Sequence, residues 1–227
     1  PNLGAPRVQL LDGGQSLLLR LPTLSAAQGQ AVIEAVEPVA GPFLSGGQSV
    51  DTIGPSLGKQ LLRSSLISLL VAFSGIAAYI SFRYDRRYAF LALVALAHDV
   101  AIVCGVFAWL GVVLQLEVDS LFAVSLLTIA GYSVNDTVVV FDRIRERSKD
   151  AADLPLSVQV DQAVSATLTR TLYTSGTTLL PLLALVFFGG ATLYWFAIAL
   201  ALGVVVGSWS SIALAPSLLT LWDRSRD

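Results

Sequence analysis

The chain has 227 residues, of which 55% are hydrophobic and only 13% are charged, and its formal net charge is -2. An ordinary soluble domain carries about 25% charged residues, so this composition argues against a soluble enzyme or a disordered chain and predicts an integral membrane protein. The small negative charge gives no sign of a basic nucleic-acid surface, and we expect no nucleic-acid partner.

Residues 1–58 are predicted to form a small water-facing α+β segment. A strand is expected at 16–22, and a helix capped by Ser25 is expected from about 26 to 36. A second strand is expected at 48–53. A segment of this size has too little core to stand alone, so we expect it to be part of a larger domain. The sequence starts with Pro1 and contains no methionine, which we interpret as a fragment without its N-terminus.

Residues 59–227 are predicted to form a transmembrane domain. Five long apolar segments are near or above the roughly 20 residues that a helix needs to cross a membrane. A helix is the expected form because it satisfies its own backbone polar groups in lipid. The segments lie near 61–82, 88–110, 118–141, 169–188 and 193–221.

The short loops between these segments differ in their basic residues. Arginine and lysine gather after the first span, after the third span and in the tail, whereas the turns at 111–117 and 189–192 contain none. The positive-inside rule therefore predicts that the basic loops and the C-terminus are cytoplasmic. With an odd number of spans, residues 1–58 are then expected on the opposite, periplasmic side.

Asp136 lies deep in the third predicted span. A charged group at the centre of a membrane helix costs about 2.5–3.5 kcal/mol, so it persists where it faces protein or water. The polar neighbours Ser133, Asn135 and Thr137 support a stripe that faces other helices or a wet cavity. We expect Asp136 to carry a proton; the alternative is a residue that only makes a packing hydrogen bond.

Arg170 begins the fourth predicted span from the cytoplasmic side. An arginine near a helix end can simply extend its charge to the interface. However, Thr174 and Thr177 continue a polar stripe on the same face, and consecutive helices are often neighbours. An Asp136–Arg170 pair that forms and breaks with protonation would couple proton passage to helix movement.

Two further features lie within the predicted spans. His98 and Asp99 are near the middle of the second span. Histidine titrates near neutral pH, so a proton relay and a helix-locking hydrogen bond are both open interpretations. Gly203 and Gly207 form a small-xxx-small pattern that favours close helix packing over ligand binding.

Motifs for catalysis and metal binding are missing from the sequence. There is no phosphate-binding loop and no HExxH motif, and one histidine and one cysteine are too few for an ordinary protein zinc site. We therefore expect no enzyme activity, no cofactor and no metal site.

Residues 131–146 read GYSVNDTVVVFDRIRE, and this stretch resembles the signature of the SecF protein-export subunits of the SecD/SecF family, in the RND superfamily. Shorter matches follow the same family order. They are Ile53-Gly54-Pro55, Ser81-Phe82-Arg83, His98-Asp99-Val100, Thr169-Arg170-Thr171, Thr174–Thr178 and Gly207–Ser211. The family has six spans, with a periplasmic domain after the first. The resemblance therefore implies an RND-like bundle of five transmembrane helices, with the first family helix missing and a partial α+β periplasmic domain.

The resemblance also implies a function. The chain would pair with SecD and use the proton motive force to assist export of a translocating polypeptide through the SecYEG translocon, which the SecA motor drives. The family's intramembrane Asp and Arg map onto Asp136 and Arg170, and the residues leave proton and sodium coupling open. The implied location is the bacterial inner membrane, with the thylakoid membrane as a second option. Alternatives are a subunit of an RND small-molecule exporter and a purely structural translocon subunit.

Overall fold

The computed structural model describes residues 7–11, 16–21, 24–41, 55–114, 116 and 118–224. The chain divides into two compact units, Pro1–Arg63 and Ser64–Asp227. Each unit is described by itself below.

Before residue 55, the described residues of the N-terminal unit form a two-stranded antiparallel sheet and one helix. Strand β1 (Arg7–Leu11) pairs with β2 (Ser16–Arg20), and Arg7 lies opposite Arg20. Strand β2 falls inside the stretch predicted as a strand, whereas β1 was not predicted. The strand expected at 48–53 lies outside the described residues.

Helix α1 (Ala26–Ala40) begins at the predicted cap. The Ser25 hydroxyl accepts from the Gln28 amide, and the Gln28 side chain accepts from the Ser25 amide, which is a complete capping box. The helix continues past the predicted end near Val36 and includes Pro38. Gly41 ends it with a φ of 87°, a conformation that glycine adopts without steric cost.

The second unit is a bundle of long helices, the first of which begins at Pro55 within the N-terminal unit. Within the described residues, five helices are long and apolar enough to cross a membrane. This confirms the predicted α-helical membrane protein. The helices are α2 (Pro55–Arg83), α3 (Arg86–Leu114), α4 (Ser120–Asp150), α5 (Leu156–Phe188) and a continuous rod formed by α6 (Gly190–Trp209), η2 (Ser210–Leu214) and α7 (Ala215–Arg224). Element η2 is a π-helical turn.

Two helices, α4 and α5, extend furthest beyond the segments that the sequence predicts. The third span was expected to end near 141, but α4 continues to Asp150; the fourth was expected to start near 169, but α5 starts at Leu156. Hydropathy detects only the apolar part of a helix, and these extensions are amphipathic. Ile144 of the α4 extension is fully buried, and Val160 of the α5 extension is 4% exposed. Tertiary packing therefore sustains both helices beyond their apolar segments.

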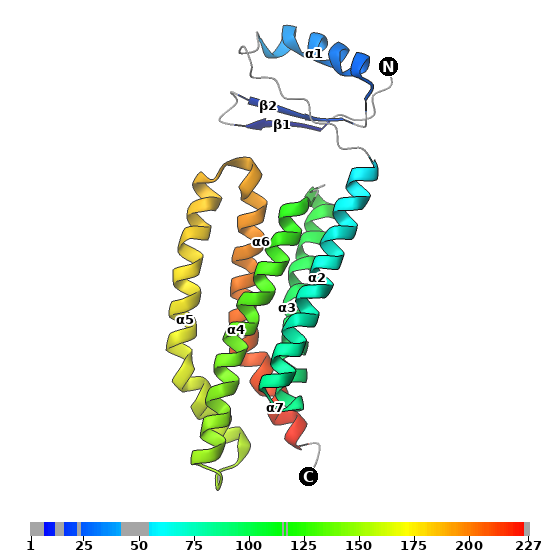
Figure 1. Ribbon diagram of the computed structural model, residues 1–227. Helices are drawn as coiled ribbons and strands as arrows, with labels where there is room; N and C mark the ends of the chain where they lie inside the picture. The colour runs from blue at the N-terminus through cyan, green and yellow to red at the C-terminus, as the bar shows by residue number, and fades with distance from the viewer. Residues whose placement is uncertain are drawn as a thin grey trace. The chain divides into compact units, whose positions relative to one another are not determined.

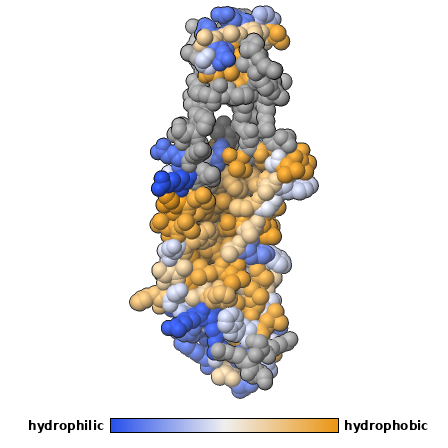
Figure 2. Space-filling view, turned by 90° about the vertical axis from the view of Figure 1, so that its right-hand side faces the viewer, coloured by the Kyte–Doolittle hydropathy of each residue, from blue (hydrophilic) through white to orange (hydrophobic). Residues whose placement is uncertain are grey.

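Helix α4 lies in the middle of the bundle and packs against α3, α5 and α6 (Figure 1). More than half of its apolar window, 56%, is buried, compared with 6% for the span formed by α2. Helix α2 contributes to the core near its C-terminal end, where Ile80 is buried. On the face shown in Figure 2, hydrophobic side chains form a broad band over the helices, which suits contact with lipid.

Candidate functional site

Asp136 lies on the buried face of α4. Its side chain is only 4% exposed, and its neighbour Thr137 is 1% exposed. Among the described residues, neither the Asp136 Oδ2 atom nor the Thr137 hydroxyl has a hydrogen-bond partner. An unpaired polar group inside a protein costs free energy, so these atoms are exceptions that need an explanation.

Arg170 is exposed on α5, which packs against α4. The two residues form no salt bridge in this structure, within the part of the chain that it describes. The arrangement is thus two opposite charges on neighbouring helices that form no salt bridge with each other.

The threonines that follow Arg170 are satisfied within their own helix. Thr174 donates to the Arg170 carbonyl at 2.9 Å, and Thr177 donates to the Tyr173 carbonyl at 2.8 Å. Asn135 and Thr177 are exposed, whereas Ser133 and Thr137 are buried. The predicted supporting residues therefore divide between the interior of the bundle and its outer surface.

Asp99 is completely buried and connects three elements. On α3, the His98 Nδ1 atom lies 3.0 Å from Asp99 Oδ1. From α4, the Ser133 hydroxyl donates to Asp99 Oδ2 at 2.5 Å, and from η2 the Ser210 hydroxyl donates to the same oxygen at 2.7 Å. We call Asp99, Ser133 and Ser210 the three-helix cluster. The sequence analysis included Ser210 only in the Gly207–Ser211 family match and did not connect it with Asp99, because 111 positions separate the two residues.

The glycines of α6 bring that helix against α4. A Cβ atom at Gly203 would lie 2.3 Å from the Ile129 side chain, and one at Gly207 would lie 3.2 Å from the Ser133 Cβ. Close packing is therefore the role of this glycine pair, as predicted. Ser208 of the same helix shares a hydrogen bond with Ser175 of α5.

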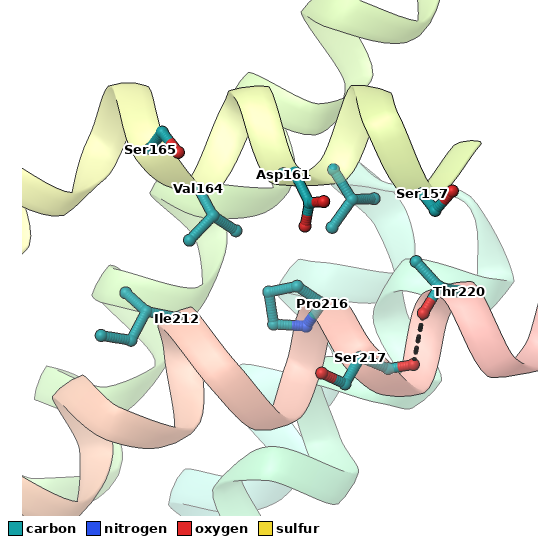
Figure 3. Close-up of a pocket in the computed structure, with 9 residues that line it drawn as sticks. Ser157, Asp161, Val164, Ser165, Ile212, Pro216, Ser217 and Thr220 are labelled. Atoms are coloured by element: carbon teal, nitrogen blue, oxygen red, sulfur yellow. Dashed lines mark hydrogen bonds between the residues drawn. The ribbon is translucent and has the colours of Figure 1, made fainter. Parts of the chain in front are cut away.

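A pocket of about 270 Å³ lies apart from these residues, between the first turns of α5 and the segment formed by η2 and α7. Figure 3 shows Asp161 and Ser157 of α5 facing Pro216 and Thr220 of α7. The Thr220 hydroxyl donates to the Ser217 carbonyl at 2.8 Å. None of the predicted site residues lines this pocket.

No group of three or more potential metal ligands from His, Cys, Asp and Glu occurs among the described residues. The geometry offers instead a buried carboxylate, a cation on the next helix and a hydroxyl cluster. Such an arrangement can take up and release a proton, and it can change helix contacts when it does so.

The sequence is similar to known proteins over nearly its whole length. It is 70% identical over 215 residues to the protein translocase subunit SecF of Prochlorococcus marinus, covering 95% of this chain and 67% of that protein. It is 43% identical over 225 residues to SecF of Synechocystis sp., covering 99% and 71%. It is 39% identical to the SecDF subunit of Thermus thermophilus, covering 93% of this chain and 28% of that longer protein.

The fold is also that of a solved relative. The crystal structure of SecDF, a translocon-associated membrane protein from Thermus thermophilus, superposes with a TM-score of 0.79 at 38% identity, covering 92% of this chain and 28% of that chain. The family described as protein export membrane protein SecD/SecF, C-terminal, matches residues 43–225. The chain therefore belongs to the SecD/SecF family of protein-export membrane proteins.

Proposed function

We propose that the chain acts in protein translocation as a SecF-type subunit that couples the proton motive force to polypeptide export. Its relatives are named protein translocase subunits, and one of them is a single SecDF chain, which supports an association with SecD. The proposed wider partners are the SecYEG translocon, the SecA motor and the emerging polypeptide. The proposed role needs no enzyme activity and no cofactor.

One observation carries the proton-coupling part of this proposal: Asp136 is 4% exposed and has an oxygen without a hydrogen-bond partner inside a membrane-spanning helix. Intramembrane carboxylates are expensive and mark proton pathways. When Asp136 is ionised, it attracts Arg170 of α5. When it is protonated, that attraction is lost and α4 and α5 are free to adopt another packing.

The proton motive force supplies enough free energy for this change in the packing of α4 and α5. Moving one charge through 100 mV is worth about 2.3 kcal/mol. This corresponds to a shift of roughly fifty-fold in a two-state equilibrium. One proton per cycle could therefore bias a conformational change of the subunit substantially.

The proposed orientation follows from the charges at the ends of the helices. The helix ends and short connections at 83–87 and 143–149 carry most of the basic residues of the helical unit, so we place them and the C-terminus in the cytoplasm. The N-terminal unit, with its α+β composition, is then periplasmic. The proposed location is the bacterial plasma membrane, with the thylakoid membrane as the second option.

The test uses inverted membrane vesicles that contain the complete export machinery, with SecD from the same genome. Asp136→Asn and Arg170→Met are each expected to abolish the stimulation of export by a proton gradient while leaving membrane insertion intact. Asp153→Asn and Lys149→Met remove the same charges from exposed positions and are expected to leave the stimulation unchanged.

Two outcomes would contradict the proposal. Full proton-dependent stimulation in Asp136→Asn would make Asp136 a packing residue and the chain a structural subunit of the translocon. Stimulation by a sodium gradient in place of a proton gradient would replace the proposed coupling ion.

A further inference from the structure

The three-helix cluster contains a carboxylate with no exposure to the surface of the protein. Asp99 is 0% exposed, as are Ser125, Ser210 and Ser211, and Ser133 is 1% exposed. A buried carboxylate persists only when its oxygens accept enough hydrogen bonds. Asp99 is therefore the second buried acidic side chain of the bundle, and the proton-coupling step proposed above does not use it.

Both carboxylate oxygens of Asp99 have hydrogen-bond partners. Ser133 and Ser210 donate to Oδ2, and the His98 Nδ1 atom lies at hydrogen-bonding distance from Oδ1. Asp99 thus differs from Asp136, which has an oxygen without a partner. A fully satisfied polar network of this kind fixes the relative positions of the elements that contribute to it.

The cluster lies next to Asp136 along α4. Ser133 precedes Asp136 by three residues, about one helical turn, and both side chains belong to the buried face of α4. At the same level, Gly207 allows α6 to approach, since a Cβ there would lie 3.6 Å from Asp99 Oδ2. Any movement of Ser133 relative to Asp99 would therefore move the turn that carries Asp136.

Charged and titratable groups around the two carboxylates are few. His98 of α3 is in contact with Asp99, and Arg170 lies on α5, which packs against α4. Of the other elements packed against α3 and α4, α6 and η2 contain no charged residue, and the one tyrosine of α6, Tyr194, lies near its start. Helix α7 carries Asp223 and Arg224 at its C-terminal end. The link between Asp99 and η2 is therefore made by an uncharged group, the Ser210 hydroxyl.

We propose that Asp99 is a positioning residue for Asp136: it clamps α4 to the first residue of the π turn, and so sets where Asp136 lies relative to Arg170. This inference rests on the proposed proton-coupling function of Asp136. Its specific claim is that the hydroxyls of Ser133 and Ser210 position Asp136 through their hydrogen bonds to Asp99, and do more than fill space in the core.

Two serines of the chain provide matched controls. Ser211 follows Ser210 and is equally buried, but its hydroxyl donates to the Ser208 carbonyl. Ser125 lies on the same face of α4 as Ser133 and is equally buried, but its hydroxyl donates to the Phe122 carbonyl. Each control loses one buried hydroxyl without touching Asp99.

The experiment measures proton-stimulated export against pH in the vesicles described above, for Ser133→Ala, Ser210→Ala, Ser125→Ala and Ser211→Ala. We expect the first two to shift the midpoint of the pH profile by about half a pH unit or more, because each removes one hydrogen bond to Asp99. The two control variants are expected to retain the wild-type midpoint. Asp99→Asn should shift it further, since an amide cannot accept from all three donors.

The outcomes separate this inference from the proposed function. If Asp136→Asn abolishes stimulation but all four serine variants keep the wild-type midpoint of the pH profile, the positioning role of Asp99 is wrong and the proposed function stands. A loss of amplitude without a shift of the midpoint in Ser133→Ala and Ser210→Ala would also overturn it, because a purely structural role predicts that result. If Asp136→Asn keeps its stimulation, both proposals fall.

Discussion

At the scale of single residues, the buried polar groups of the bundle fall into two kinds. Asp99 has three potential donors on its two oxygens, whereas Asp136 has an oxygen with no partner among the described residues. Leaving a buried acceptor unpaired costs about 1–3 kcal/mol. A side chain kept at such a cost is more typical of a functional group than of a structural one, and this difference supports separate roles for the two carboxylates.

Tyr84, between α2 and α3, is a third notable residue, and it lies outside the membrane-spanning segments. It is 7% exposed, and the Arg83 guanidinium lies 5.2 Å from the centre of its ring. Burial, followed by the charge of the nearby Asp142 and a hydrogen bond to it, raises the pKa of the Tyr84 phenol to about 12. Tyr84 thereby links the loop after α2 to the extension of α4.

This pKa predicts a pH dependence of stability. The folded pKa lies above the unfolded value of about 10, so the contribution of Tyr84 is complete below that pH and is lost as the pH rises toward 12. Tyr84→Phe lacks this group, and its free energy of unfolding is expected to fall less between pH 10 and 12 than that of the wild type. Unfolding in detergent, measured across this range, checks the difference; parallel curves for the two proteins would contradict it.

At the scale of elements, the contact between α4 and α6 depends on the absence of side chains. Gly203 lies against Ile129, and Gly207 lies against Ser133, so the two helices approach where α6 has only hydrogen atoms. Helix association in lipid gains little from the hydrophobic effect and depends on such close packing. This contact also brings η2, which follows α6 directly, to the level of Asp99.

Gly203→Ala is therefore expected to lower the free energy of unfolding by about 1–3 kcal/mol, because its Cβ would overlap the Ile129 side chain. The double variant with Ile129→Ala should lose less than the sum of the two single changes, since the second removes the overlapping atoms. Gly105→Ala is the control, because a Cβ at that position meets nothing within 4 Å. Unfolding in detergent measures all four proteins, and equal costs at Gly203 and Gly105 would refute the packing argument.

At the scale of the whole molecule, the number of spans determines which segments share a side of the membrane. Three of the five crossings separate α1 from the loop between α4 and α5, so these two segments are expected on opposite sides. The single cysteine, Cys104, lies within a span and can be replaced by alanine to give a background for labelling.

In that background, Glu37→Cys and Asp153→Cys each place one thiol at an exposed position. A membrane-impermeant maleimide is expected to label Glu37→Cys in spheroplasts, in which the periplasmic face of the membrane is accessible to the reagent. Asp153→Cys should react only in inverted vesicles. Labelling of both positions from one side would contradict the three crossings expected between them, and labelling from the reverse sides would contradict the predicted orientation.

The sequence was sufficient to predict the membrane helices and the burial of Asp136, because both depend on local patterns of about 20 apolar residues and on the cost of a charge among them. It was not sufficient to predict the three-helix cluster, in which Asp99 and Ser210 lie 111 positions apart. It also did not predict the helical extensions to Asp150 and from Leu156, which tertiary packing sustains. The π turn was missed as well, since Ser-Ser-Ile-Ala-Leu carries no distinctive local signal.

The π turn has a geometric consequence for the end of the chain. Its hydrogen bond runs from the Ala215 amide to the Ser210 carbonyl, so it contains one residue more than an α turn. One added residue rotates everything that follows by about 100° around the helix axis. The rod formed by α6, η2 and α7 therefore presents Gly203 and Gly207 to α4 and, after this change of phase, brings Trp222 of α7 to Phe90 of α3. Chain length at this point, more than the identity of any one residue, sets which face of α7 meets α3.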